Sequence, residues 1–246
     1  MKRLLQLLPA AAGLWFVLHA GGRIALLRRL FPAAAQHSYT RIPLPQLLLE
    51  HLQLVLVSSS GAAVLGILIG VMVTRRAGRV FLPLVRDGAS IMQTLPPVAV
   101  LALAVPLLGF GTRPALLALV LYSILPVLSN TIAGLEDVPP AVRQAASGMG
   151  MTPLQRLLWV ELPIAARVIL AGIRISVVIN VGTATVGTVV GAGGLGVPIV
   201  AGLVRDNLPF ILEGALAAAW VAYVLDRLLA EVVHSSYSPQ SGLDGR

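Results

Sequence analysis

The sequence predicts an all-α membrane protein, a polytopic bundle of six membrane-spanning helices made of one N-terminal helix and five core helices. Hydrophobic residues make up 57% of the 246 residues and charged residues only 11%, whereas a soluble domain carries about 25% charged residues. The mean hydropathy is +0.89. Several separate apolar runs reach the roughly 20 residues that a spanning helix needs. Too little polar surface is therefore available to cover a water-soluble globule.

The first apolar run, Leu4 to Ala20, follows the basic start Met1-Lys2-Arg3 and lacks the small-residue cleavage site of a secretory signal peptide. We therefore expect residues 1–22 to be a retained transmembrane segment. Residues 23–46 combine four arginines with three prolines. We expect them to form an extracytoplasmic linker that contains a short interfacial helix from Ile24 to Phe31.

Five further spans are predicted within residues 47–231, which would form one transmembrane domain. They cover residues 47–73, 88–112, 114–135, 164–190 and 208–229. Prolines occur inside these runs, and membrane helices tolerate them because neighbouring groups satisfy the freed carbonyls. Residues 232–246 are polar and are expected to form a C-terminal tail.

Arginines are distributed unevenly among the short loops, and this predicts the orientation. One side holds Arg75, Arg76, Arg79, Arg86, Arg143 and Arg156, whereas the other holds Arg113 and Arg205. Because cytoplasmic loops carry the excess of Lys and Arg, residues 136–163 and the C-terminus should be cytoplasmic. The glycine-rich segment 191–196 should then lie near the outer face, and the four arginines of residues 23–46 are the exception to the rule.

Composition excludes several classes of function. The net charge of +8 comes from basic residues at the ends of apolar runs, whereas nucleic-acid binding needs a clustered basic face. The absence of cysteine excludes thiol chemistry and disulfides within the chain. The four histidines lack partners at metal-site spacing, and we read Glu50-His51 as an interfacial polar pair. We predict no catalytic residues, no metal site and no enzymatic activity.

The polar interval from Glu136 to Pro163 has the pattern of a short helix, a tight turn and a second helix. Pro139 and Pro140 suit a first helical turn, so Ala141 to Met149 is expected to be helical. Gly150 then provides a stop, because glycine accepts a positive φ. Thr152, Pro153 and Gln155 match an N-cap, a first helical residue and the reciprocal residue of a capping box.

The same interval resembles the EAA-loop signature of ATP-binding cassette (ABC) importer permeases. Gln144-Ala145-Ala146 is followed by Gly150 and, at the family's spacing, by Leu162-Pro163, with Val160 at the family's hydrophobic position. The family has Glu at the first position, where this chain has Gln144. An amide can still donate and accept hydrogen bonds there.

This resemblance, over roughly residues 47–229, implies the fold of a type I ABC importer permease. It implies that Gln144, Ala145, Ala146, Gly150, Met151, Leu162 and Pro163 couple the chain to a separate ATPase subunit through the helix at residues 139–150. That ATPase would use the ATP, since a phosphate-binding loop requires a lysine and the only lysine is Lys2. The other implied partners are an extracytoplasmic substrate-binding protein and a second permease copy or paralogue. The implied location is the bacterial inner membrane.

Several shorter sequence segments are most similar to segments of the permeases that import glycine betaine, choline or carnitine. They are residues 93–97, 121–126, 145–152, 182–185 and 191–196. The resemblance therefore implies an osmoprotectant or quaternary-amine permease. A permease for another small solute, such as a methionine-type amino-acid permease, shares related glycine-rich phrases and is the alternative.

Two charged residues inside the predicted spans, Arg174 and Glu213, are expected to form intramembrane ion pairs, because ionisable groups in lipid are paired or functional. An ion-driven secondary transporter would instead favour an inverted repeat and carboxylates at the midplane. A membrane-embedded enzyme would need a polar catalytic set within the spans. The sequence shows neither pattern.

Overall fold

A computed structural model describes residues 2–235 of the chain. Every regular element in that range is helical, which confirms the predicted all-α fold. Four helices are each long and apolar enough to cross a membrane, and up to six spans result if each of two bent helix pairs counts as one. The range of four to six spans includes the predicted number.

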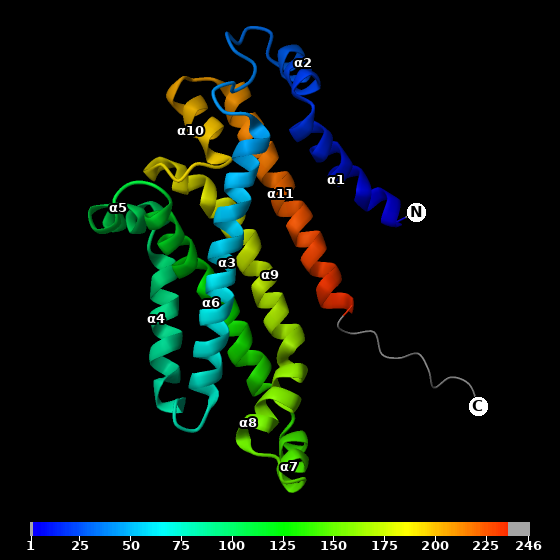
Figure 1. Cartoon of the computed structure of the whole chain (residues 1–246), viewed down its shortest axis with the longest axis vertical. Coiled ribbons are helices and arrows are strands. Elements are labelled where there is room, and N and C mark those ends of the chain that lie inside the picture. The colour runs from blue at the N-terminus through cyan, green and yellow to red at the C-terminus, as the bar shows by residue number, and fades with distance from the viewer. Residues whose placement is uncertain (1, 236–246) are drawn as a thin grey trace, which may run out of the picture.

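Three long helices form the centre of the bundle. They are α3 (Leu44–Thr74), α6 (Thr112–Glu136) and α9 (Leu162–Gly187), and α11 (Leu208–Ser235) packs beside α9 (Figure 1). Glycines allow the backbones to approach closely. A Cβ on Gly66 would lie 2.9 Å from Val127, and one on Gly172 would lie 2.7 Å from the carbonyl oxygen of Pro126.

Buried polar side chains also join α3 to α9. The imidazole Nε2 of His51 lies 3.1 Å from the carbonyl oxygen of Val181. The Asn180 amide donates to the hydroxyls of Ser58 and Ser59 at 3.0 and 2.9 Å. His51 is thus a buried interhelical contact, and its position at the membrane interface stays a prediction. It lies two turns inside α3, on the face that packs against α9.

The predicted span 88–112 is not one straight helix. It is divided between α4 (Leu82–Thr94) and α5 (Pro97–Leu108), which meet at 96°. Pro96 and Pro97 are the physical reason, because neither has an N–H and a residue before proline avoids the helical region. At this break between the two helices, the carbonyl of Leu95 accepts a hydrogen bond from the Tyr122 hydroxyl of α6.

The N-terminal region forms two helices that meet at a sharp bend. α1 (Lys2–Leu18) packs against α11, and α2 (Ala20–Leu30) follows at 99° (Figure 1). The short helix expected from Ile24 to Phe31 therefore begins four residues earlier. The 17 residues of α1 measure about 26 Å at 1.5 Å per residue. That residues 1–22 span the membrane stays a prediction.

A buried ion pair holds the linker on the bundle. Arg23 Nε lies 2.8 Å from Glu213 Oε1, with both side chains at most 5% exposed. The same carboxylate accepts from the Ser38 hydroxyl at 2.8 Å and from the Tyr39 N–H at 2.7 Å. A buried carboxylate needs this many partners to offset its lost hydration.

Short elements occupy the two ends of the bundle. α7 (Pro140–Gly148), α8 (Pro153–Arg156) and the 3₁₀ turn η1 (Arg79–Phe81) lie at one end. The 3₁₀ turn η3 (Thr188–Val190) and α10 (Gly196–Val204), a helix that the sequence patterns did not predict, lie at the other (Figure 1). The predicted tail 232–246 begins later than expected, since α11 continues through Ser235, and residues 236–246 lie outside the described residues.

Candidate functional site

The polar interval folds as a short helix, a glycine turn and a capped helix. α7 begins at Pro140 and ends at Gly148, and Gly150 has a φ of 78°. The Thr152 hydroxyl accepts from the Gln155 N–H at 3.3 Å, and the Gln155 side chain accepts from the Thr152 N–H at 2.8 Å. The glycine turn and the capping box are both confirmed. Together they reverse the chain direction and return it to the bundle.

α7 presents a small, uncharged face to its surroundings. Gln144, Ala145 and Gly150 are exposed, whereas Ala146 is buried against the rest of the loop. Met149, at the end of the helix, is 71% exposed, and Met151 is half-buried. The face is therefore flat, and it carries one prominent apolar side chain.

Leu162 and Pro163 lie at the far end of the loop, where the chain enters α9. Leu162 packs against the buried cluster that contains Leu135. Pro163 has no N–H to donate to the carbonyl four residues earlier. The residues before it form a π-helical turn, η2 (Leu157–Glu161), and such turns often occur at functional sites. These two motif residues thus shape the entry to α9 and do not belong to the α7 face.

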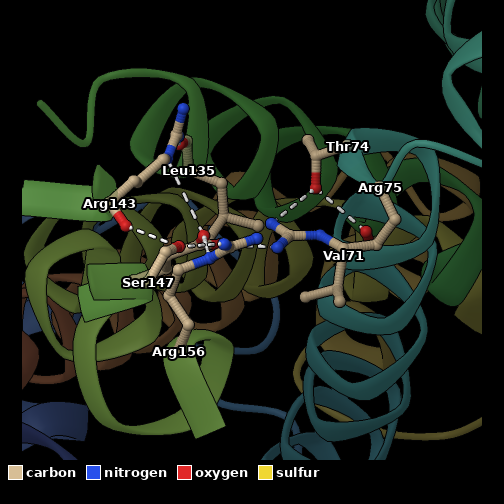
Figure 2. Close-up of polar contacts among 8 residues, drawn as sticks. Val71, Thr74, Arg75, Leu135, Arg143, Ser147 and Arg156 are labelled. Carbon is tan, nitrogen blue, oxygen red and sulfur yellow. Dashed lines mark hydrogen bonds and ion pairs between the residues drawn. The ribbon is translucent and has the colours of Figure 1, made fainter. Parts of the chain in front are cut away.

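η2 places the carboxylate of Glu161 at the centre of an arginine cluster. Its side chain is 1% exposed. Arg75 Nη1 donates to Oε2 at 2.5 Å, Arg156 Nε donates to Oε1 at 3.0 Å, and Arg143 Nε lies 3.7 Å from Oε1. Figure 2 shows the guanidinium groups of Arg75 and Arg156 extending toward each other from different helices. One carboxylate therefore joins the end of α3, α7, α8 and η2.

Further hydrogen bonds hold these arginines in place (Figure 2). Arg143 also donates to the Leu135 carbonyl, one of the last four carbonyls of α6, which have no partner within the helix. Arg156 donates to the Ser147 hydroxyl at 2.8 Å, and that hydroxyl donates to the Arg143 carbonyl at 2.9 Å. α7 is thereby fixed to α6 and α8 as well as to Glu161.

The cluster lines a cleft of about 1040 Å³ at this end of the bundle. The lining side chains include Arg75, Arg76, Arg79, Arg143 and Arg156 together with Glu136 and Glu161. Five arginines and two glutamates leave an excess of three positive charges. An excess of this size attracts anionic groups over a range set by salt screening.

The sequence patterns identified the loop but not Glu161. The signal was a single carboxylate next to Leu162, at the start of an apolar run, where an ionisable group requires a partner. The partner Arg75 is 86 positions away along the chain, and sequence spacing carries no information about such a contact.

The structure gives each of the two expected intramembrane charges its own partner. Arg174 makes a two-pronged contact with Asp226 of α11, at 2.6 and 2.7 Å. Glu213 pairs with Arg23, as described above. Arg174 and Glu213 therefore do not contact each other, and neither belongs to the Glu161 cluster.

Comparison with known proteins assigns this chain to a family. The family model described as "Binding-protein-dependent transport system inner membrane component" matches residues 62–239. That match covers more than two thirds of the chain, from the middle of α3 past the end of α11.

Similar proteins of known function come from several bacteria. The osmoprotectant import permease protein OsmY of Salmonella typhimurium is 45% identical over 181 residues, which cover 74% of this chain and 77% of that protein. The choline transport system permease protein OpuBB of Bacillus subtilis is 40% identical over 188 residues, which cover 74% and 82%.

A solved structure shows the same fold at low identity. The inward-facing MetNI methionine ABC transporter contains a chain that matches with a TM-score of 0.70 and 23% identity, covering 81% of this chain and all of that one. At this identity the likeness concerns the fold, which is that of an ABC importer permease.

Proposed function

This chain belongs to the family of inner-membrane components of binding-protein-dependent transport systems, and we propose that it imports a quaternary-amine osmoprotectant by coupling to a separate ATPase through α7. As a member of this family it is a multi-pass membrane subunit of a transporter. The proposal concerns its cargo, its partners and the residues that carry the coupling.

The coupling proposal rests on the exposed position of α7 at one end of the bundle. The helix lies at one end of the bundle, offers an exposed face of Gln144, Ala145 and Met149, and is fixed behind that face by Arg143. A short helix with small residues on its exposed side suits insertion into a groove, with one apolar anchor. The residues proposed to act in coupling are Gln144, Ala145, Ala146, Gly150 and Met151 in and just after α7, and Leu162 and Pro163 where the loop enters α9.

The Glu161 cluster provides a route by which a displacement of α7 reaches the spans. Arg143 connects α7 to Glu161, and Arg75 connects Glu161 to the end of α3. Glu161 is the residue immediately before α9. Because these contacts are charged, and Glu161 itself is buried, they resist separation more strongly than neutral ones. A partner that moves α7 would then move α3 and α9 together.

The cargo proposal rests on the relatives. OsmY, OpuBB and the carnitine transport permease protein OpuCD of Listeria monocytogenes are named for osmoprotectants, choline and carnitine. Choline and carnitine both carry a quaternary ammonium group. We propose cargo of the same chemical class for this chain.

The remaining parts of the proposal concern assembly and orientation. ATP would be bound and hydrolysed by the partner subunit, and an extracytoplasmic binding protein would deliver the cargo. A second permease, identical or related, would complete the path. The α7 end and the C-terminus would face the cytoplasm of a bacterium, in agreement with the arginine excess in the loops at the α7 end.

Transport reconstitution tests the proposed function. We expect the chain, reconstituted in liposomes with its ATPase and binding protein, to accumulate radiolabelled choline or glycine betaine only when ATP is supplied on the α7 side. Uptake driven by an ion gradient with the purified chain alone would contradict the proposal. Accumulation of methionine in place of quaternary amines would refute the cargo while leaving the coupling intact.

Cysteine cross-linking tests the docking surface directly. The chain has no cysteine, so each single-cysteine variant carries one thiol. We expect Ala145→Cys to cross-link to the ATPase subunit with a short bismaleimide. Val204→Cys, which is 81% exposed on α10 at the other end of the bundle, is the matched control. Equal cross-linking at both positions, or none at residue 145, would exclude α7 as the docking helix.

A further inference from the structure

The structure contains a hollow of about 420 Å³ far from the arginine cluster. Its lining residues come from the outer turns of α3, the start of α6 and the glycine segment that follows η3. These elements meet at the end of the bundle opposite α7 (Figure 1). The lining of the hollow combines the aliphatic side chains of Leu54, Val57, Leu116 and Ala192 with the polar side chains of Gln53, Thr112 and Glu50. Glu50 of α3 is the only ionisable residue among those that line it.

The carboxylate of Glu50 has only neutral partners. Oε2 accepts from the Gly194 N–H at 3.1 Å, and Oε1 accepts from the Gln46 amide at 3.3 Å. Among the described side chains it has no ion-pair partner, whereas Glu136, Glu161 and Glu213 each pair with arginine. This half-buried carboxylate is thus available as the counter-charge for a cation that enters the hollow.

The glycine segment is shaped to fit this carboxylate. Gly193 and Gly194 both have a φ of 80°, a conformation that glycine adopts at no steric cost. A Cβ on Gly193 would lie 2.6 Å from Glu50 Oε2, so a side chain there would displace the carboxylate. The backbone therefore holds Glu50 in one position at the hollow while leaving its charge uncompensated.

We propose that this hollow binds the quaternary ammonium group of the cargo, with Glu50 as its counter-ion; this inference rests on the proposed function. A quaternary ammonium group has no N–H to donate, so it requires a negative charge and apolar contacts but no set of hydrogen-bond acceptors. The hollow offers that combination, since the Glu50 carboxylate lies beside the apolar side chains of Leu54, Val57 and Leu116. It replaces the aromatic cage that often binds such cations, and it lies at the end where delivered cargo would arrive.

Choline binding to the purified full-length chain in detergent tests the site without ATP or partners. Glu50→Gln removes the charge but keeps an oxygen that accepts from the Gly194 N–H. We expect this variant to bind choline at least about tenfold more weakly, a change that corresponds to about 1.4 kcal/mol, with an unchanged unfolding midpoint. Glu136→Gln, which removes an exposed carboxylate at the α7 end, should bind choline like the wild type. Equal affinity in Glu50→Gln and the wild type would overturn the proposal.

Carbodiimide labelling of Glu50, read by mass spectrometry, locates the bound cation. We expect choline to protect Glu50, and its neutral isostere 3,3-dimethylbutanol to leave labelling unchanged. Protection by the isostere, or equal protection by sodium ions, would overturn recognition of a quaternary cation. Protection by choline in a chain that fails ATP-driven uptake would refute the proposed function alone. Normal uptake by Glu50→Gln, together with unprotected Glu50, would refute this inference alone.

Discussion

Replacing Glu161 with alanine should lower the free energy of unfolding by about 3 kcal/mol and abolish coupled transport. Removing one partner of a buried ion pair costs about 3–5 kcal/mol, because the remaining charge loses its compensation. The lower end applies here, since the three arginines are 28–32% exposed and retain some hydration. Thermal or denaturant unfolding of the purified chain in detergent measures the change.

Glu136→Ala is the matched control for this prediction. Glu136 also pairs with an arginine, Arg86, at 2.8 Å, but the two side chains are 39% and 51% exposed. Exposed pairs contribute about 0–1 kcal/mol, so this variant should stay close to the wild type. Similar losses of unfolding free energy in the two variants would show that the burial of Glu161 does not make its ion pairs more stabilising.

The transport consequence of Glu161→Ala separates a coupling role from a purely structural one. We expect the assembled transporter to retain ATP hydrolysis but to lose its stimulation by loaded binding protein, because α7 would no longer be tied to α3 and α9. Glu161→Gln keeps the hydrogen-bond acceptor and should lose less stability than alanine. Normal coupled transport by Glu161→Ala, whatever its stability, would contradict the proposed route.

Replacing Gly150 with valine should abolish coupled transport in a chain that still inserts into the membrane. Gly150 has a φ of 78°, a region that a β-branched residue occupies only as an outlier. Such strain costs about 1–3 kcal/mol, and the turn can relieve it by rotating α7 away from its docking position. ATP-driven uptake, normalised to the amount of inserted chain, measures the effect.

Gly150→Asn separates backbone strain from added bulk. Asparagine tolerates the left-handed conformation better than other residues that have side chains, and a Cβ at this position meets no atom within 4 Å. We therefore expect Gly150→Asn to retain most of the uptake. Equal loss in the asparagine and valine variants would place the effect at the docking surface and contradict the backbone explanation.

Local chemistry predicted the loop well because each of its signals acts within a few residues. Pro140 starts α7, Gly150 ends the turn, and Thr152 with Gln155 closes the capping box. These contacts depend on neighbours three or four positions away. A single sequence therefore contains all the information that they need.

Sequence patterns were less informative where helices meet one another. Apolar composition alone predicted one span over residues 88–112, although Pro96 and Pro97 divide it. The place of His51 beside Glu50 gave no sign that α9 covers its imidazole. In each case a tertiary contact, the Tyr122 hydroxyl or the Val181 carbonyl, satisfies the polar group.

The membrane environment, the all-α class, the helix–turn–helix form of the loop and the family resemblance could all be predicted without a structure. Hydropathy, capping and proline chemistry are properties of short segments, which is why they can be read without a structure. The contacts of Glu161 with Arg75, Arg143 and Arg156 follow from the tertiary structure alone. So does the lack of an ion-pair partner for Glu50 among the residues that the structure describes. Those outcomes depend on which helices pack together, because a charge is compensated by whatever the fold brings near it.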